Sequence, residues 1–174
     1  KFESTDSTID DVNPATSEVI AQIPKSGSHE VENAVDAADL ARKSWSDLGL
    51  EKRTIWLDKI ADVLESKSEE IASLESLDTG KPISLARAVD ASRSVANFRF
   101  FADFARDYQS EQFEMDDAIN HVILKPVGIA GLITPWNLPL YLLSWKIAPA
   151  IVMGNTVVAK PSELTPLTAN LLAE

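Results

Sequence analysis

The sequence contains no cysteine, which excludes disulfide bonds, thiolate metal sites and a cysteine nucleophile within these 174 residues. It has only two histidines, His29 and His121, and neither has a second ligand at metal-binding spacing, so no metal is expected. The glycine patterns that cradle phosphate, G-x-G-x-x-G and Walker A, are also missing. The segment therefore offers no thiolate, metal or phosphate-loop chemistry of its own.

Basic residues are scarce, since 16 Lys and Arg stand against 27 Asp and Glu for a net charge of −11. The charges from Val127 onward cancel, so the whole net charge lies in residues 1–126. A chain without a basic stripe argues against a nucleic-acid partner and against an anionic membrane surface. The most apolar run, Leu138–Val152, includes Lys146 and is too short to span a bilayer. With no apolar leader in the polar start, we expect a soluble cytoplasmic protein.

The composition is otherwise ordinary for a globular domain, with 45% hydrophobic and 25% charged residues. We divide the chain into three parts. Residues 1–111 form an N-terminal strand and helical segment, residues 112–126 a β arm for oligomerisation, and residues 127–174 the first βαβ unit and a helix start. The arm is predicted as a β-hairpin because Asp116-Asp117 interrupts a partly alternating pattern.

Apolar spacing predicts several helices before the arm. A short strand over Glu18–Ile23 follows the turn at Asn13-Pro14. Ser28 is the expected N-cap of the first helix, and Gly80 ends the third. The expected core faces of the first three helices are Val31, Ala34, Val35, Ala38, Ala41 and Trp45; Ile55, Trp56, Ile60, Val63 and Leu64; and Ile71, Leu74 and Leu77.

A long helix is predicted from Pro82 onward, because proline is tolerated in the first turn. One face of this helix carries a row of aromatic side chains, including Phe100 and Phe104, which we assign to core packing rather than to a cofactor site.

The most informative stretch runs from Ile129 to Thr168. An apolar run over Val127–Ile133, bounded by prolines, predicts a buried parallel strand. A helix then follows Trp136, a second strand covers Thr156–Ala159, and another helix begins at Thr165-Pro166. This order predicts an α/β fold, namely the opening part of a Rossmann-like, doubly wound cofactor-binding domain with N-terminal helices and a β-hairpin arm.

Polar residues follow both predicted strands, at the sheet edge where such folds bind ligands. Asn137 lies directly after Thr134-Pro135-Trp136, and its amide could donate to an oxygen that gains negative charge, or could merely cap the next helix. Lys160 and Glu163 frame a turn after the second strand. A carboxylate there could bind a ribose diol, or the turn could be an ordinary solvated loop.

The segments ESLDTGKP, LITPWNLPLYLLSWKIAPA and GNTVVAKPSELTPLT, in this order along the chain, resemble signatures of the NAD(P)-dependent aldehyde dehydrogenase superfamily over essentially the whole chain. The resemblance implies that Asn137 binds the aldehyde oxygen and its tetrahedral adduct. It also implies an NAD site, whose nicotinamide side is lined by the backbone of residues 133–136. The residues implied to contact NAD are Ile133, Thr134, Pro135, Trp136, Lys160, Ser162 and Glu163.

The stretches NLPLYLLSWKIAPA and DASRSVANFRFFAD resemble the 2-aminomuconate and hydroxymuconate semialdehyde dehydrogenase branch. In that branch, Arg93 would border the substrate channel with Leu142 and Trp145. An arginine fork matches a substrate carboxylate, although Arg93 could instead pair with an aspartate on its own helix. Glu163 favours NAD over NADP, because it would repel a 2′-phosphate.

The resemblance thus implies an enzyme that oxidises an aldehyde, expected to be an acidic semialdehyde, to a carboxylate with NAD, and that forms a homodimer or homotetramer. The family's cysteine nucleophile and glutamate base would lie beyond Glu174, so we expect a chain truncated relative to the family and inactive alone. The alternatives are a non-catalytic nucleotide-binding or interaction fragment, and a phosphate-dependent semialdehyde reductase of related fold. The Pro-Trp-Asn sequence disfavours the reductase.

Overall fold

The computed structural model describes residues 7–174 and confirms an α/β chain with small sheets. The strands are β1 (Thr8–Val12), β2 (Val19–Pro24), β3 (Gln112–Glu114), β4 (Ile119–His121), β5 (Ile129–Ile133) and β6 (Thr156–Lys160). The helices are α1 (Ser28–Ser46), α2 (Leu50–Ser66), α3 (Ser68–Thr79), α4 (Ile83–Leu85), the π-helical η1 (Ala86–Ala91), α5 (Ser92–Asp107), α6 (Pro139–Val152) and α7 (Leu167–Ala173).

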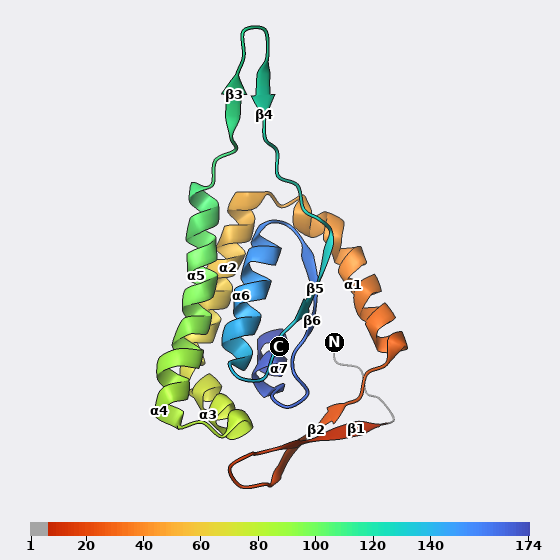
Figure 1. Ribbon diagram of the computed structural model, residues 1–174, viewed down its shortest axis with the longest axis vertical. Helices are drawn as coiled ribbons and strands as arrows, with labels where there is room; N and C mark the ends of the chain where they lie inside the picture. The colour runs from red at the N-terminus through yellow and green to blue at the C-terminus, as the bar shows by residue number, and fades with distance from the viewer. Residues whose placement is uncertain (1–6) are drawn as a thin grey trace.

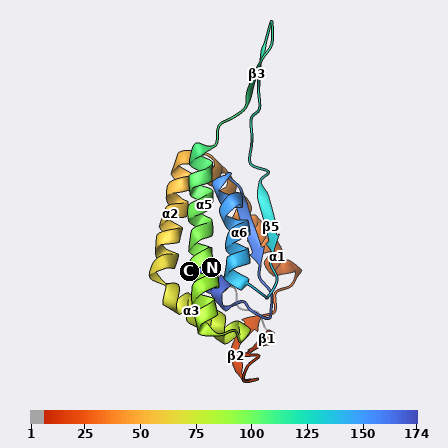
Figure 2. The ribbon, with the colours of Figure 1, turned by 60° about the vertical axis from the view of Figure 1, so that its left-hand side comes forward.

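The parallel pair β5–β6 lies between α6 on one side and α1 on the other, as Figures 1 and 2 show. Helices α2 and α5 pack side by side next to α6. The β1–β2 hairpin lies at one end of the molecule, and the β3–β4 arm projects from the opposite end (Figure 1). The predicted βαβ order over residues 127–174 is therefore confirmed.

The core is built where α2, α5 and α6 meet. Leu57, Phe98 and Leu140 are fully buried in it, together with small residues that let the helices approach closely. Alanines such as Ala61 and Ala102 carry little side-chain volume, which explains how three helices share one interface. Burying these side chains favours this arrangement by roughly 1.5–3 kcal/mol for each large residue.

Several predicted core faces were wrong. On α1 only Ala38 is buried, while Val31 and Val35 are exposed. On α2 the predicted face is correct only at Leu64, which is buried, and at Ile60, which packs against the core; Ile55, Trp56 and Val63 are exposed, and the other buried apolar residues are Leu57 and Ala61. The aromatic row on α5 is not core either, because Phe100 and Phe104 are 61% and 59% exposed, stacked on each other with ring centroids 6.3 Å apart.

Three local features also differ from prediction. The helix of residues 82–107 is interrupted by the six residues of η1, whose wider turn the apolar spacing did not signal. Strand β1, which pairs antiparallel with β2, was not predicted, because its sequence TIDDV carries two acidic residues. The first helix begins after Gly27 rather than after Ser28, with Glu30 accepting a hydrogen bond from the Gly27 amide at 2.6 Å.

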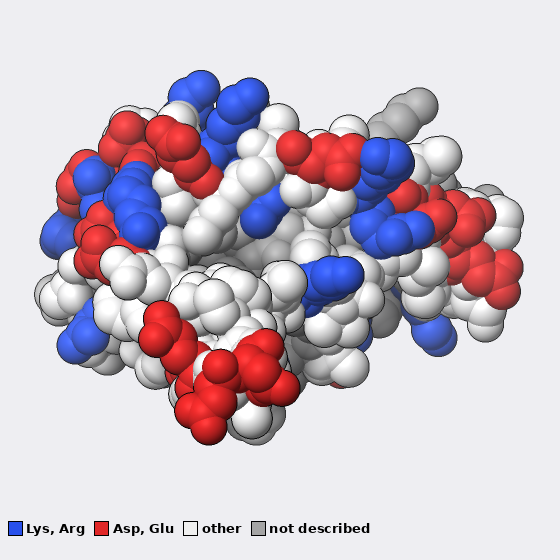
Figure 3. All heavy atoms as spheres, turned by 90° about the horizontal axis from the view of Figure 1, so that it is seen from above, with Lys and Arg blue, Asp and Glu red and all other residues white. Residues whose placement is uncertain are grey.

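Strand β5 was predicted to be buried, yet its residues are half-buried or exposed. In the part of the chain described, β5 and β6 form a two-stranded sheet, so each has an open edge. Among residues 7–174, every helix is too short or too polar to cross a membrane. On the face seen from the arm end, basic side chains are scattered among acidic ones (Figure 3).

Candidate functional site

The carboxyl ends of β5 and β6 lie side by side. The parallel register pairs Ile129 with Thr156 and ends by pairing Ile133 with Lys160. The next residue, Thr134, is buried and donates its backbone N–H to the Lys160 carbonyl at 3.2 Å. The two turns that carry the predicted site residues therefore leave the sheet at the same edge.

Asn137 lies in the turn between β5 and α6, with its side chain exposed to solvent. The suggestion that it caps the next helix is not supported, because the N-cap of α6 is Leu138 and makes no side-chain cap. The free amide of Leu140 instead donates to Glu75 Oε1 of α3 at 3.0 Å. Helix capping is thus done by a residue from another element, and the Asn137 amide group has no partner within residues 7–174.

The other residues predicted on this turn present mainly backbone and ring surfaces. Ile133 and Trp136 are 70% and 60% exposed, and Pro135 is exposed as well. The Ile133 carbonyl accepts a hydrogen bond from Lys146 Nζ, and the Trp136 carbonyl accepts one from Thr165 Oγ1 at 3.4 Å. Sequence reasoning missed Lys146 as a contact of this turn; its only signal was a lone charge in an apolar helix.

Lys160 and Glu163 form an ion pair across the second turn, with Nζ 2.7 Å from Oε2. Their side chains are 61% and 55% exposed, so both heads are open to a ligand. The hydrogen bond from Lys160 lowers the pKa of Glu163, which keeps that carboxyl ionised. Ser162 differs from them, because its side chain is buried and its Oγ accepts the Leu164 N–H at 3.2 Å. Its hydroxyl shapes the turn rather than facing the surface.

A hollow of about 580 Å³ adjoins these turns. It is bounded by the two turns, by β1 and by the end of α3; the lining residues are Asp10, Asp11, Val12, Pro14, Asp78, Thr79, Lys81, Leu85, Trp136, Asn137, Leu138, Leu164 and Thr165. The predicted catalytic residue Asn137 therefore lines this hollow. Of the residues predicted to contact the cofactor, only Trp136 is among the described residues that line it.

Two buried carboxyl groups, Asp11 and Asp78, lie at the floor of this hollow, each 1% exposed. Asp78 Oδ2 accepts the Leu167 N–H at the start of α7 at 3.0 Å. Burial raises the pKa of Asp78 to about 8, and the negative charge of Asp11 adds to the rise. Burial also raises the pKa of Asp11. At neutral pH Asp78 therefore keeps its proton, which limits the repulsion between the two carboxyls.

This pair predicts a stability that falls with pH. The folded chain keeps a proton on Asp78 up to about pH 8, whereas the unfolded chain releases it near its ordinary value of 3.8. The contribution of Asp78 to folding stability is therefore fully present below about pH 4 and is lost as pH rises to about 8. The Asn side chain in Asp78→Asn stays uncharged at every pH, so the Tm of this variant should decline less between about pH 6 and pH 9 than the Tm of wild type. The expected difference between the two declines is about 3 °C or more.

Thermal unfolding followed by circular dichroism at the two pH values checks this, with Asp36→Asn on the exposed side of α1 as the matched control. Equal declines of Tm with pH for wild type and Asp78→Asn would show that Asp78 holds no proton at neutral pH.

The residues predicted to contact substrate lie on α5 and α6. Asn97 Nδ2 donates to the Tyr141 carbonyl at 3.1 Å and to Ser144 Oγ at 2.9 Å, which fixes the two helices against each other. Arg93 lies one turn before Asn97 on the same face and is exposed. Trp145 is 49% exposed, with its ring 5.4 Å from that of Tyr141.

The suggested pairing of Arg93 with an aspartate of its own helix region is not found. Asp90 binds Lys81, and Asp103 binds Arg106. Within residues 7–174, Arg93 is left without an ion pair. Leu142 is half-buried on α6, and neither it nor Arg93 or Trp145 lines the hollow beside Asn137.

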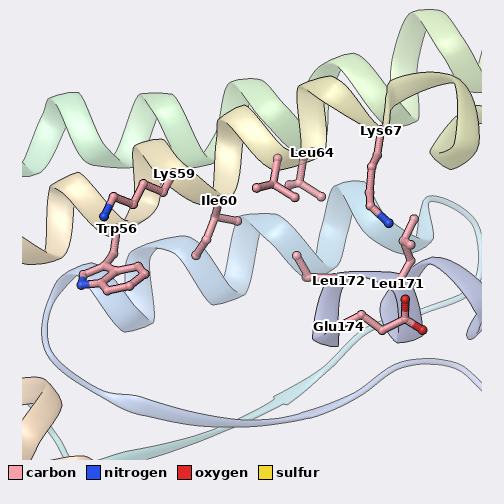
Figure 4. A pocket seen from close by; sticks show the side chains of 9 residues that line it. Trp56, Lys59, Ile60, Leu64, Lys67, Leu171, Leu172 and Glu174 are labelled. Carbon is pink, nitrogen blue, oxygen red and sulfur yellow. The ribbon is translucent and has the colours of Figure 1, made fainter.

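A second hollow, of about 390 Å³, lies between α2 and α7 (Figure 4). Its walls are mainly apolar, with Trp56, Ile60 and Leu64 facing Leu171 and Leu172. None of the predicted site residues lines it. Among the described residues no three His, Cys, Asp or Glu side chains are grouped as metal ligands, and His29 and His121 are both exposed.

The aldehyde dehydrogenase family profile matches residues 2–174. The chain belongs to the aldehyde dehydrogenase family. It is 52% identical over 171 residues to the 2-aminomuconic semialdehyde dehydrogenase of Mus musculus, covering 97% of this chain and 35% of that protein. It is 46% identical to the 2-hydroxymuconic semialdehyde dehydrogenase of Pseudomonas sp. (strain CF600), covering 96% of this chain and 36% of that protein.

The fold agrees with that of a solved structure. PnpE from Pseudomonas sp. WBC-3, crystallised in complex with nicotinamide adenine dinucleotide, superposes with a TM-score of 0.95 at 41% sequence identity. The match covers 100% of this chain and 36% of PnpE. The chain thus spans about a third of the length of the aldehyde dehydrogenase relatives it matches.

Proposed function

We propose that this chain acts as part of an NAD-dependent aldehyde dehydrogenase that oxidises an acidic semialdehyde to the carboxylate. The observation that carries the proposal is the shared edge of β5 and β6. There the unpartnered amide of Asn137 follows one strand, and the open Lys160–Glu163 pair follows the other. Amide donors and an acidic ribose acceptor at the carboxyl ends of parallel strands are what dinucleotide-dependent oxidation requires.

In this proposal Asn137 donates its side-chain N–H to the aldehyde oxygen. That oxygen becomes negatively charged when a nucleophile attacks the carbonyl carbon, so the hydrogen bond strengthens as the reaction proceeds. A cysteine nucleophile would have to come from outside these 174 residues, since the sequence has none. Bound NAD would supply the hydride acceptor.

The cofactor fits the residues present. Lys160 and Glu163 both expose their charged groups, which now pair with each other. A ribose diol can replace this ion pair by hydrogen-bonding to both side chains. The ionised Glu163 would repel a 2′-phosphate, which supports NAD over NADP. Backbone from Ile133 to Trp136 lies at the same edge and can border the nicotinamide end.

The acidic substrate class is supported by Arg93. Among the described residues Arg93 has no ion pair, and it is exposed on α5, the helix that packs against the α6 helix carrying Trp145 and Leu142. A free arginine fork suits a carboxylate of the substrate. Two of the most similar relatives are named for muconic semialdehydes, which carry such a carboxylate.

The assay that tests the proposed function uses the full-length enzyme, NAD and 2-hydroxymuconate semialdehyde. NADH absorbance should rise in step with formation of the dicarboxylate product. A preparation that binds NAD but reduces none of it with any aldehyde would instead indicate a non-catalytic nucleotide-binding protein.

Glu163→Gln in the full-length enzyme should shift the cofactor preference. Removing one negative charge that faces the 2′ position should raise kcat/KM for NADP relative to that for NAD by about tenfold. Steady-state rates with both cofactors measure the ratio, and Glu51→Gln on the exposed side of α2 is the control. An unchanged ratio would remove Glu163 from the ribose site.

We also propose that the enzyme assembles into a homodimer or homotetramer through the β3–β4 arm. The arm stands away from the body and exposes Phe113, Met115, Ile119 and Ile123. A two-stranded hairpin with apolar side chains in water is marginal alone and gains by pairing with another chain. For location we propose the cytoplasm, which suits a strongly acidic globular chain of ordinary composition.

A further inference from the structure

Lys81 is an unusually enclosed lysine. Its side chain is 12% exposed, and Nζ lies 2.9 Å from both carboxylate oxygens of Asp90 and 3.7 Å from Glu75 Oε2. Both carboxylates are fully buried. Lysine heads are rarely buried, because removal from water is costly unless the charge is well paired.

Two of these three residues, Lys81 and Glu75, also contact the turn that carries Asn137. Lys81 Nζ donates to the backbone carbonyl of Asn137 at 3.4 Å. Glu75 Oε1 accepts the Leu140 N–H at 3.0 Å and the Thr168 hydroxyl at 2.8 Å. Both ends of the tetrapeptide 137–140 are therefore held by one buried network that belongs to α3 and the segment after it.

This turn needs external support. The Asn137 side chain has no anchor of its own among the described residues, and Leu138 has non-helical φ and ψ angles of −143° and 70°. An oxyanion donor works only if it is held in place before the reaction, and a misplacement of about 1 Å can cost roughly 100-fold in rate.

We propose that Lys81 is a positioning residue for Asn137, and that Glu75 and Asp90 hold Lys81 in that position. The ammonium group fixes the Asn137 carbonyl, and Glu75 fixes the start of α6, so the amide side chain between them faces the hollow in one orientation. The inference rests on the proposed function, because it assigns Lys81 a role through the oxyanion donor.

The test is a double-mutant cycle in the full-length enzyme, combining Lys81→Met with Asn137→Ala. The single-turnover rate of NADH formation is measured at saturating NAD and aldehyde, per active site. In the wild-type background Lys81→Met should slow this step by about 10-fold or more, while in the Asn137→Ala background it should slow it less than about twofold. Lys59→Met, at an exposed lysine beside Trp56 on α2, should leave the rate unchanged.

The cycle separates the two claims. Equal losses from Lys81→Met in both backgrounds would overturn the positioning role and make Lys81 a purely structural residue. No loss from Asn137→Ala alone would overturn the proposed function itself. If Lys81→Met does not fold, Asp90→Asn takes its place, because it keeps the shape of the side chain and releases the lysine; the same non-additivity is expected, and its absence refutes the inference.

Discussion

Replacing Asn137 by alanine in the full-length enzyme is expected to lower kcat by about 100- to 1,000-fold, the loss typical of removing one oxyanion donor. The amide is exposed at the carboxyl end of β5 and has no structural partner among the described residues, so its loss should remove transition-state stabilisation without disturbing the fold. The KM for NAD should change little, because the proposed ribose contacts, Lys160 and Glu163, lie on the other turn. Steady-state and single-turnover kinetics with the semialdehyde measure both effects.

Asn170→Ala, at an exposed asparagine on α7, is the control for this variant. An unchanged rate of the chemical step in Asn137→Ala, with normal folding, would leave the residue as part of the turn only.

Replacing Arg93 by alanine should discriminate between substrates. A charge-assisted contact with a distal carboxylate contributes about 1.5–3 kcal/mol, or roughly one to two decades in kcat/KM. An aliphatic aldehyde of similar size makes no such contact and should be oxidised nearly as before. The comparison is kcat/KM for the muconate-type semialdehyde and for the aliphatic aldehyde, each with wild type and Arg93→Ala.

Arg87→Ala provides the matched control, since Arg87 lies in η1, six residues before Arg93, and pairs on the surface with Glu69. Equal losses on the acidic and the neutral substrate would make Arg93 a structural helix residue. The acidic-substrate assignment would then lose its chemical support from this chain.

The βαβ part of the fold could be predicted from sequence because its signals are local. Proline before and after residues 127–133 limits the strand, and Gly154 ends the following helix in a left-handed conformation, with φ of 91°. Parallel pairing then follows from the crossover helix, and it brings Asn137 and Glu163 to one edge. The positions of the candidate residues were thus accessible before the structure, whereas their chemical roles remain predictions.

The buried polar network could not be predicted, because its partners are distant in sequence. Glu75 contacts Leu140, 65 positions away, and Asp78 contacts Leu167, 89 positions away. The helical spacing of apolar residues on α3 predicted Leu77 in the core, but Leu77 is 39% exposed. The buried residues beside it are the carboxylates Glu75 and Asp78. Only tertiary hydrogen bonds and helix capping make those carboxyls stable inside.

The prediction that Phe100 and Phe104 on α5 pack in the core was wrong for a related reason. Helical spacing shows that Phe100 and Phe104 share a face, but not which neighbour covers that face. Small residues decided the packing instead, since Ala102 and Ala105 let α5 approach α2 closely and turned the large rings outward. Residue size at a helix contact, rather than hydrophobicity alone, set the orientation.

A crystal structure of the full-length enzyme with bound NAD tests the site most directly. The adenosine ribose hydroxyls should lie within hydrogen-bond distance of Lys160 Nζ and the Glu163 carboxylate, with the ion pair between these two residues, now 2.7 Å long, opened to admit them. The Asn137 amide should point toward the nicotinamide end. NAD bound away from the β5–β6 edge, with Lys160 and Glu163 still paired to each other, would contradict the proposed site.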